Sequence, residues 1–182
     1  MKKAVFLDRD GVINEEVNYL SRVEDFKFIP NALKALKLLS DTDFKIIIIT
    51  NQSGICRGYF IMDDVRKIHD YMLEEFKKEK VRIDGIYICP HHPDEDCECR
   101  KPKIGLLIEA AREFDLNLKE SYFIGDKTTD IQTGKNALCK TILVETGYSG
   151  KDSNYDVESD FVARDLLEAV KFIVSHKNKQ KI

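Results

Sequence analysis

Two aspartates that could act together stand directly after the first apolar run of the chain. Residues 4–7 are apolar, and Asp8-Arg9-Asp10-Gly11 follow them. In an extended chain, residues two positions apart point to the same side, so both carboxylates can face one site. Two acids this close repel each other, and a divalent cation with oxygen ligands relieves that repulsion. The pair therefore predicts a metal site, with a charged turn as the alternative interpretation.

Polar residues also follow two later apolar runs. Residues 50–53 (Thr-Asn-Gln-Ser) come after the apolar residues 46–49, and residues 125–127 (Gly-Asp-Lys), with Asp130 beyond them, come after residues 122–124. Ligands of open parallel sheets bind beyond the carboxyl ends of the strands. We therefore expect these groups to meet at one edge, although a helix cap or an Asx-turn would also explain residues 50–53.

Two cations precede the helix that we expect to start near Ile104. Arg100 and Lys101 are adjacent there, and cations in such a place can neutralise a phosphoryl group. The order of these groups along the chain predicts a site in which carboxylates and cations surround a phosphate.

A second cluster of possible ligands lies in residues 89–99. Cys89, His91, Cys97 and Cys99 can supply the four ligands of tetrahedral zinc from one loop. No position for a catalytic water remains if all four bind, so the cluster predicts a structural Zn²⁺. A redox-active or simply buried group of cysteines is the alternative, and disulfides are disfavoured because the chain has five cysteines.

Short apolar runs alternate with amphipathic stretches, which predicts the elements that must position these residues. We expect strands over residues 4–7, 46–49, 85–89, 122–124 and 141–144. We expect helices over residues 31–39, 63–80, 104–114, 129–137 and 165–175. This alternation indicates an α/β fold with right-handed crossovers and a mainly parallel sheet. We predict a single domain over residues 1–176 and a frayed tail over residues 177–182.

Residues 64–80 carry an apolar stripe at helical spacing that includes Val65, Met72 and Phe76, and we assign this stripe to the core. His69 on the same helix and His176 near the end of the chain are expected to be solvated.

Charge and hydropathy disfavour two classes of partner. The 29 Lys and Arg against 32 Asp and Glu give a net charge of -3, so no global basic field recruits nucleic acid or anionic lipid. No apolar run approaches the roughly 18 residues of a membrane span, and Asp8 interrupts the first apolar run too early for an export signal. We expect a soluble, cytoplasmic protein with no nucleic-acid or membrane partner, and we favour a monomer.

The polar groups after the strands resemble the four motifs of the haloacid dehalogenase (HAD) superfamily of phosphatases. The matching residues are Asp8-Arg9-Asp10-Gly11, Thr50-Asn51, Lys101, and Gly125-Asp126 with Asp130. The resemblance implies a Rossmann-like three-layer fold, without a large cap domain and with the zinc-binding loop added. It also implies that Asp8 is the nucleophile, Asp10 the general acid and base, Thr50 a ligand of the phosphoryl oxygen, Lys101 a stabiliser of charge, and Asp8, Asp10 and Asp126 the ligands of a catalytic Mg²⁺.

The cysteine loop narrows the resemblance. Cys-Pro-His-His-Pro from position 89, Cys-x-Cys-Arg-Lys-Pro from position 97, and Thr-Asn-Gln-Ser-Gly-Ile-x-Arg-Gly from position 50 are similar to the D-glycero-D-manno-heptose 1,7-bisphosphate 7-phosphatases. That family makes heptose 1-phosphate for the nucleotide-activated heptoses of the bacterial surface, and the likeness implies an aspartyl-phosphate intermediate. Carried over by position, the implied contacts with the phosphorylated sugar are Glu16, Val17, Asn18, Tyr19, Thr50, Asn51, Gln52, Ser53, Arg100, Lys101 and Lys127.

Two alternative functions stay open. A histidinol-phosphate phosphatase shares these motifs and the zinc loop, and Lys103 is one feature that also resembles that group. A non-catalytic metal-binding module on a HAD scaffold is the other, although it would be expected to lose at least one of the catalytic residues present here. The preference for the α or β anomer of the sugar stays open as well.

Overall fold

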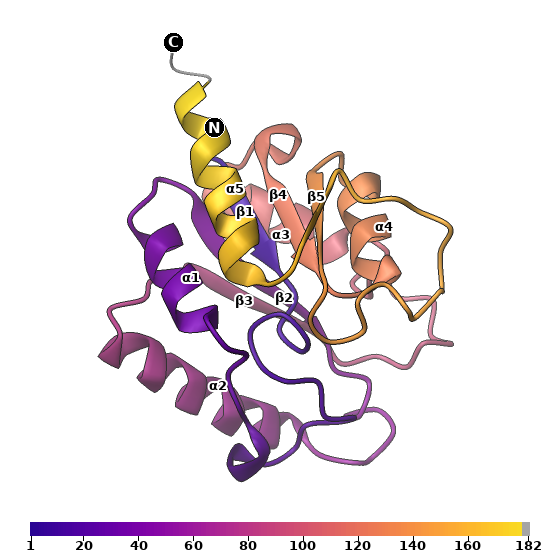
Figure 1. The fold of residues 1–182 in the computed structure, drawn as a ribbon. Helices are drawn as coiled ribbons and strands as arrows, with labels where there is room; N and C mark the ends of the chain where they lie inside the picture. Colours follow the sequence, from indigo (N-terminus) through magenta and orange to yellow (C-terminus); the bar gives the residue numbers. More distant parts are fainter. Residues whose placement is uncertain (180–182) are drawn as a thin grey trace.

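A computed structural model of the chain describes residues 1–179, and its centre is a parallel sheet of six strands (Figure 1). The strand order is β3-β2-β1-β4-β5-β6. The strands are β1 (Ala4–Leu7), β2 (Lys45–Asn51), β3 (Gly85–Cys89), β4 (Tyr122–Gly125), β5 (Lys140–Val144) and β6 (Phe161–Ala163). The predicted parallel α/β fold is confirmed.

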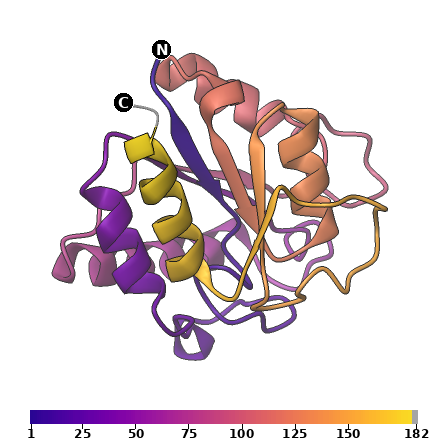
Figure 2. The same ribbon diagram turned by 45° about the horizontal axis from the view of Figure 1, so that its top comes forward.

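Helices cover both faces of this sheet. The helices are α1 (Ala32–Ser40), α2 (Met62–Lys78), α3 (Gly105–Phe114), α4 (Thr128–Asn136) and α5 (Leu166–Lys179), with short 3-10 helices at Val23–Asp25 and Leu118–Glu120. Apolar residues of α1, α2 and α5 share one core with one face of the strands, and α3 packs in the core on the opposite face. Figures 1 and 2 show α1 and α5 side by side on one face, with α4 on the other side of the sheet.

The apolar run in β2 explains why the sheet can be buried on both sides. Ile46 and Ile48 belong to the core beneath α1, α2 and α5, whereas Ile47 and Ile49 belong to the core beneath α3. All four side chains are fully buried, as expected for a central strand covered by helices on both faces.

The strand register brings the predicted site residues to one edge. Leu7 of β1 pairs with Ile48 of β2 and with Ile124 of β4. Because the strands are parallel, the residues that follow them emerge at the same edge of the sheet. Asp8, Thr50 and Asp126 are therefore placed together by the backbone alone.

The structure differs from the sequence predictions mainly after Val144. The strand β6 was not predicted, because it has only three residues at the sheet edge and its Val162 is 51% exposed, which leaves no apolar periodicity to detect. Helix α5 continues to Lys179, into the segment 177–182 for which a tail is predicted. Residues 180–182 lie outside the described residues, so the tail and the domain boundary at residue 176 stay predictions.

No cap domain is inserted within residues 1–179. The segment between Asp10 and Thr50 contains α1 and the first part of β2, and the segment between Thr50 and Lys101 contains α2, β3 and the cysteine loop. Within the same residues, no helix combines the length and the apolar character needed to cross a bilayer.

We predict that Gly134→Ala destabilises the protein, although alanine ordinarily favours a helix. A Cβ at this position of α4 would lie 2.4 Å from Thr141 Cγ2 and 3.0 Å from Phe123 Cβ, so helix and sheet would have to separate. The expected loss is about 1 to 3 kcal/mol of unfolding free energy, as for other overpacked cores. Urea unfolding measures it, with Gln132→Ala on the same helix as the control. A stabilised Gly134→Ala variant would contradict this close contact between α4 and the sheet.

Candidate active site and metal sites

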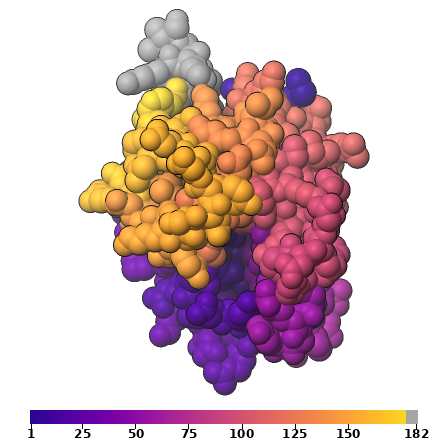
Figure 3. Space-filling view, turned by 90° about the vertical axis from the view of Figure 1, so that its right-hand side faces the viewer, coloured from indigo at the N-terminus to yellow at the C-terminus, as the bar shows by residue number. Residues whose placement is uncertain are grey.

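A cleft of about 850 Å³ opens at the carboxyl edge of the sheet. Figure 3 shows it as a hollow whose floor has the indigo colour of the N-terminal segment and whose rim is formed by later segments of the chain. Its lining includes Asp8, Gln52, Lys101, Lys127 and Tyr148. They come from the ends of β1, β2 and β4, from the loop before α3 and from the segment after β5. The cleft is therefore the place where the predicted motifs meet.

Three buried carboxylates form the centre of this site. Asp8 follows β1, Asp126 follows β4, and Asp130 lies in the first turn of α4. One oxygen from each lies within 4.8 Å of the others, and the three residues are at most 5% exposed. Two glycines enclose Asp126, because a Cβ at Gly11 or at Gly147 would come within 2.2 Å of its Oδ2.

The hydrogen bonding of Asp126 fits a cation. Its Oδ2 accepts from the backbone N–H of Tyr148 at 2.7 Å, but its Oδ1 is buried and has no hydrogen-bond partner among the described residues. Such an orphaned oxygen is rare in a native protein. Burial, followed by the charges of Asp130 and Asp8, raises the pKa of Asp126 to about 8. Carboxylate oxygens are the ligands that Mg²⁺ prefers, so these residues fit a divalent cation.

Lys101 is the cation that the protein itself supplies to this cluster. Its Nζ donates to Asp130 Oδ1 at 2.6 Å and lies 3.0 Å from Asp8 Oδ1. Burial alone would lower the pKa of the ammonium group, but the Asp130 and Asp8 charges outweigh burial and raise it. Burial raises the pKa of Asp8 to about 6, against the opposing effect of Lys101. The backbone N–H of Lys101 donates to Asn51 Oδ1 at 3.2 Å, which ties the lysine to the end of β2.

The carboxylate of Asp10 lies outside the group of three. Both of its oxygens accept from Arg9, Oδ1 also accepts from Asn14 at 2.9 Å, and Oδ2 accepts from Gln52 at 3.0 Å. Burial would raise the pKa of Asp10, but Arg9, Asn14 and Gln52 together lower it. The structure therefore brings Asp130, rather than the Asp10 carboxylate, to Asp8 and Asp126. The role of Asp10 as a magnesium ligand stays a prediction.

Most of the predicted substrate contacts line the cleft. Besides residues already placed there, they are Glu16, Asn18, Tyr19, Asn51, Ser53 and Arg100. Asp10, predicted as the general acid and base, lines the cleft as well. Val17 is 36% exposed and does not line the cleft, and Thr50 is fully buried with its Oγ1 accepting from Gln52 Nε2 at 2.8 Å.

Lys127 connects two walls of the cleft. Its Nζ lies 2.9 Å from a carboxylate oxygen of Glu16 and 4.5 Å from the ring centroid of Tyr148. Burial would lower the pKa of Lys127, but the charges of Asp8, Asp126 and Glu16 raise it. The lysine therefore stays protonated and ready to bind an anion in the cleft.

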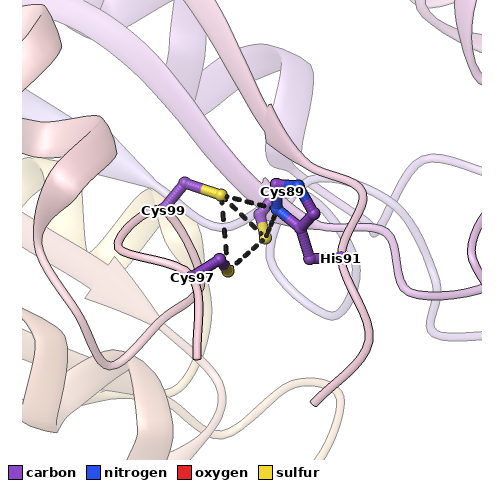
Figure 4. A group of neighbouring side chains, drawn as sticks. All are labelled: Cys89, His91, Cys97 and Cys99. Atoms are coloured by element: carbon purple, nitrogen blue, oxygen red, sulfur yellow. Dashed lines mark hydrogen bonds between the residues drawn. The ribbon is translucent and has the colours of Figure 1, made fainter. Parts of the chain in front are cut away.

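The cysteine loop brings four potential ligands to one point (Figure 4). The sulfurs of Cys89, Cys97 and Cys99 lie 3.2 to 3.7 Å apart, and His91 Nδ1 lies 3.1 Å from Cys99 Sγ and 3.7 Å from Cys89 Sγ. Zinc with bonds of about 2.3 Å to sulfur would separate tetrahedral thiolates by roughly 3.8 Å. The four side chains thus fit a single zinc ion, and all five cysteines of the chain are free of disulfides.

One expectation about this region is wrong. His69 is not solvated: it is 6% exposed, and its Nε2 lies 3.1 Å from Arg9 Nη1. The spacing contained the signal, because His69 lies four positions after Val65 and three before Met72 and so falls on the buried stripe. Arg9 was also overlooked as a site residue, since only the two flanking carboxylates were considered.

Residues after β5 were missed as well, because that segment is polar and turn-rich. The Asp152 carboxylate accepts from the backbone N–H of Thr128 at 2.7 Å and from its hydroxyl at 2.9 Å, so it caps α4. Tyr148 supplies the backbone N–H to Asp126, as described above. No short sequence pattern predicts these contacts over more than 20 positions.

Comparisons with known proteins agree with this geometry. A family model described as HAD-hydrolase-like matches residues 98–169. The D-glycero-alpha-D-manno-heptose-1,7-bisphosphate 7-phosphatase of Campylobacter jejuni is 49% identical over 142 residues, which cover 78% of this chain and 81% of that protein. The D-glycero-beta-D-manno-heptose-1,7-bisphosphate 7-phosphatase of Pasteurella multocida is 39% identical over 94% of this chain and 100% of its own length.

A solved structure is also similar over nearly the whole chain. The D,D-heptose 1,7-bisphosphate phosphatase from B. bronchiseptica, crystallised with magnesium and phosphate, superposes with a TM-score of 0.89 at 32% identity. The superposition covers 96% of this chain and 99% of that chain. The likeness confirms the three-layer fold that the motifs imply.

We predict that Mg²⁺ stabilises the protein more at high pH than at low pH. The pKa of Asp126 rises from 3.8 to about 8 on folding, so the metal-free folded protein binds a proton that the unfolded chain has already released. The stability linked to this proton is present below pH 3.8 and is lost as the pH rises through about 8. Mg²⁺ must displace the same proton, so its binding strengthens over this range.

Melting temperatures with and without Mg²⁺ at about pH 6 and about pH 9 test this linkage. The shift caused by Mg²⁺ should be larger at the higher pH, and Asp126→Asn should remove the difference. Equal shifts at both pH values in the unaltered protein would show that Asp126 is not protonated in the metal-free site.

A further prediction concerns the cysteine loop. Protein purified without added metal should contain close to one zinc per chain by elemental analysis. Cys97→Ser should lose that zinc and melt at a lower temperature, because metal-binding energy is folding energy for such a loop. The matched control is Cys56→Ser, since Cys56 is exposed and outside the cluster. If both variants melt alike and retain their metal content, the loop does not depend on zinc.

Proposed function

The chain belongs to the D-glycero-D-manno-heptose-1,7-bisphosphate 7-phosphatase family of HAD-like hydrolases, and we propose that it removes the 7-phosphate of that sugar to give heptose 1-phosphate. As a member of this family it is a phosphoric monoester hydrolase. The observation that carries the proposal is the buried group of Asp8, Asp126 and Asp130 with Lys101 at the floor of the cleft. That arrangement suits phosphoryl transfer, in which catalysis comes mainly from positioning and from charge stabilisation.

We assign the attack on phosphorus to Asp8. Two donors reach its carboxylate, the backbone N–H of Arg9 at 2.8 Å and Lys101 Nζ at 3.0 Å, and both contact Oδ1. This leaves Oδ2 as the attacking oxygen. The acyl phosphate that forms on Asp8 divides one difficult hydrolysis into two easier displacements. In the first, the Asp8 carboxylate displaces the sugar oxygen from phosphorus, and in the second, water displaces the carboxylate.

Lys101 offsets the negative charge that gathers around phosphorus. Its ammonium group stays protonated because Asp130 and Asp8 raise its pKa, and its place next to the attacking carboxylate is fixed before the substrate arrives. Asp8 and Asp126 would hold a catalytic Mg²⁺, with Asp130 beside them, and the ion would polarise the phosphoryl oxygens and neutralise charge.

Asp10 would carry the protons. It lies two residues after the nucleophile and lines the cleft, so it can donate a proton to the departing sugar oxygen and later accept one from water. The hydrogen bonds from Arg9, Asn14 and Gln52 favour the ionised form of Asp10 in the free protein, which is the form needed for the second step.

The second phosphate of the substrate would contact Arg100. This residue lines the cleft next to Lys101, and its planar guanidinium can bind a phosphate through two parallel hydrogen bonds. Lys127 lines the same cleft and would serve the reacting phosphate, exchanging its contact with Glu16 for one with the substrate.

We also propose that Cys89, His91, Cys97 and Cys99 hold a structural Zn²⁺. The ligand set has four members and leaves no open position, so the ion would serve the loop and not the reaction. Arg100 and Lys101 follow Cys99 directly in the chain. A fixed loop therefore keeps both cations in place.

Phosphate release from the purified protein tests the proposed function. The kcat/KM for heptose 1,7-bisphosphate, measured with each anomer, should exceed the kcat/KM for histidinol phosphate and for simple sugar monophosphates. Asp8→Asn should abolish turnover without unfolding the protein, because an amide oxygen attacks phosphorus poorly. A higher kcat/KM for histidinol phosphate would replace the proposed substrate, and an active Asp8→Asn variant would remove Asp8 as the nucleophile.

A further inference from the structure

A buried arginine lies between Asp10 and helix α2. The side chain of Arg9 is 1% exposed, and all three guanidinium nitrogens have partners. Its Nε and Nη2 donate to Asp10 at 3.1 and 2.8 Å, while Nη1 lies 3.1 Å from Nε2 of His69. Arg9 thus joins the acid and base of the proposed reaction to a histidine that lies outside the cleft lining.

The chemistry of this contact determines the state of His69. A guanidinium group has only donors and no acceptor, so the hydrogen bond requires a lone pair on His69 Nε2. The imidazole must then be neutral and carry its proton on Nδ1. Burial, together with the positive charge of Arg9, lowers the pKa of His69 to about 4, which agrees with a neutral ring.

The position of His69 on α2 allows it to hold the guanidinium group of Arg9 in place. His69 stands on the buried face of α2, among residues packed into the core, so its ring can move little. The guanidinium of Arg9 is planar, and holding Nη1 fixes the direction in which the opposite edge, Nε and Nη2, faces Asp10. Without an acceptor at Nε2, the guanidinium would be held by Asp10 alone and would lose the contact that fixes this direction from the helix side.

We propose that His69, acting through Arg9, is a positioning residue that holds the Asp10 carboxylate in its orientation for proton transfer. The inference rests on the proposed function, since it assigns Asp10 the proton-transfer role. His69 itself touches neither substrate nor reacting atoms. It acts as a neutral hydrogen-bond acceptor at the far end of a buried three-residue chain.

Three variants test the proposal. His69→Leu keeps a side chain of similar size but removes the acceptor. It should lower kcat about tenfold with little change in KM, because small misplacement of a catalytic group is costly. His69→Gln offers an amide oxygen as the acceptor and should restore most of the activity. The control is Met72→Leu, three positions away on the same buried face, which should affect stability without lowering kcat.

The outcomes separate positioning from packing. Unchanged kcat in folded His69→Leu, or a His69→Gln variant as impaired as His69→Leu, would overturn the proposal. The same ratios measured with glycerol phosphate, whose departing alkoxide also needs a proton, keep the test independent of the heptose. A wrong substrate assignment would then show as low activity of the unaltered enzyme on heptose bisphosphate alone.

A measurement on the unaltered protein needs no turnover. Long-range proton–nitrogen NMR correlations of the His69 ring at neutral pH should show a protonated Nδ1 and an unprotonated Nε2. A proton on Nε2 would contradict the Arg9 contact even if a His69 variant failed to fold or the enzyme acted on another ester.

Discussion

The constraint on which the site depends is the repulsion among three carboxylates buried within a few ångströms of one another. Asp8, Asp126 and Asp130 are brought together by the parallel register of β1 and β4 and by the first turn of α4. One ammonium group, Lys101, compensates part of their charge, and the raised pKa of Asp126 and its orphaned Oδ1 show that compensation within the described residues is incomplete. A divalent cation would supply the missing positive charge. In the proposed phosphoryl transfer, the same cation and the same lysine would stabilise the charge on the phosphate.

Lys101 can compensate the charge of the carboxylates only if its ammonium group stays close to them. The loop that carries it is therefore held by contacts with the neighbouring elements. Lys101 is bonded to Asn51 at the end of β2, and the loop before it returns to the cysteine cluster at Cys89, the last residue of β3. Gly105, at the start of α3, packs so closely that a Cβ there would lie 2.4 Å from the carbonyl oxygen of Glu98. A zinc ion in the cysteine cluster would be structural, and a magnesium ion in the cleft would be catalytic. The loop that carries Cys97, Cys99 and Lys101 would connect the two sites.

The sequence was sufficient to predict the features that depend on local pattern. Strand ends located Asp8 and Asp126, since polar residues that follow apolar runs mark the carboxyl edge, and ligand spacing located Cys89 to Cys99 in one loop. Contacts that depend on packing were not predictable in this way. The pairing of Arg9 with His69 requires knowing how α2 packs against the segment after β1. The contact of Tyr148 with Asp126 requires knowing how the polar segment after β5 folds back.

The central claim is that the carboxylate of Asp8 attacks phosphorus, and detection of the covalent intermediate tests it most directly. Acid quench and intact mass measurement of the Asp10→Asn variant, in which dephosphorylation is slowed, would identify that intermediate. The account predicts one phosphoryl adduct, mapped to Asp8 by peptide fragmentation. Turnover of substrate by that variant with no adduct at any time after mixing would contradict covalent catalysis.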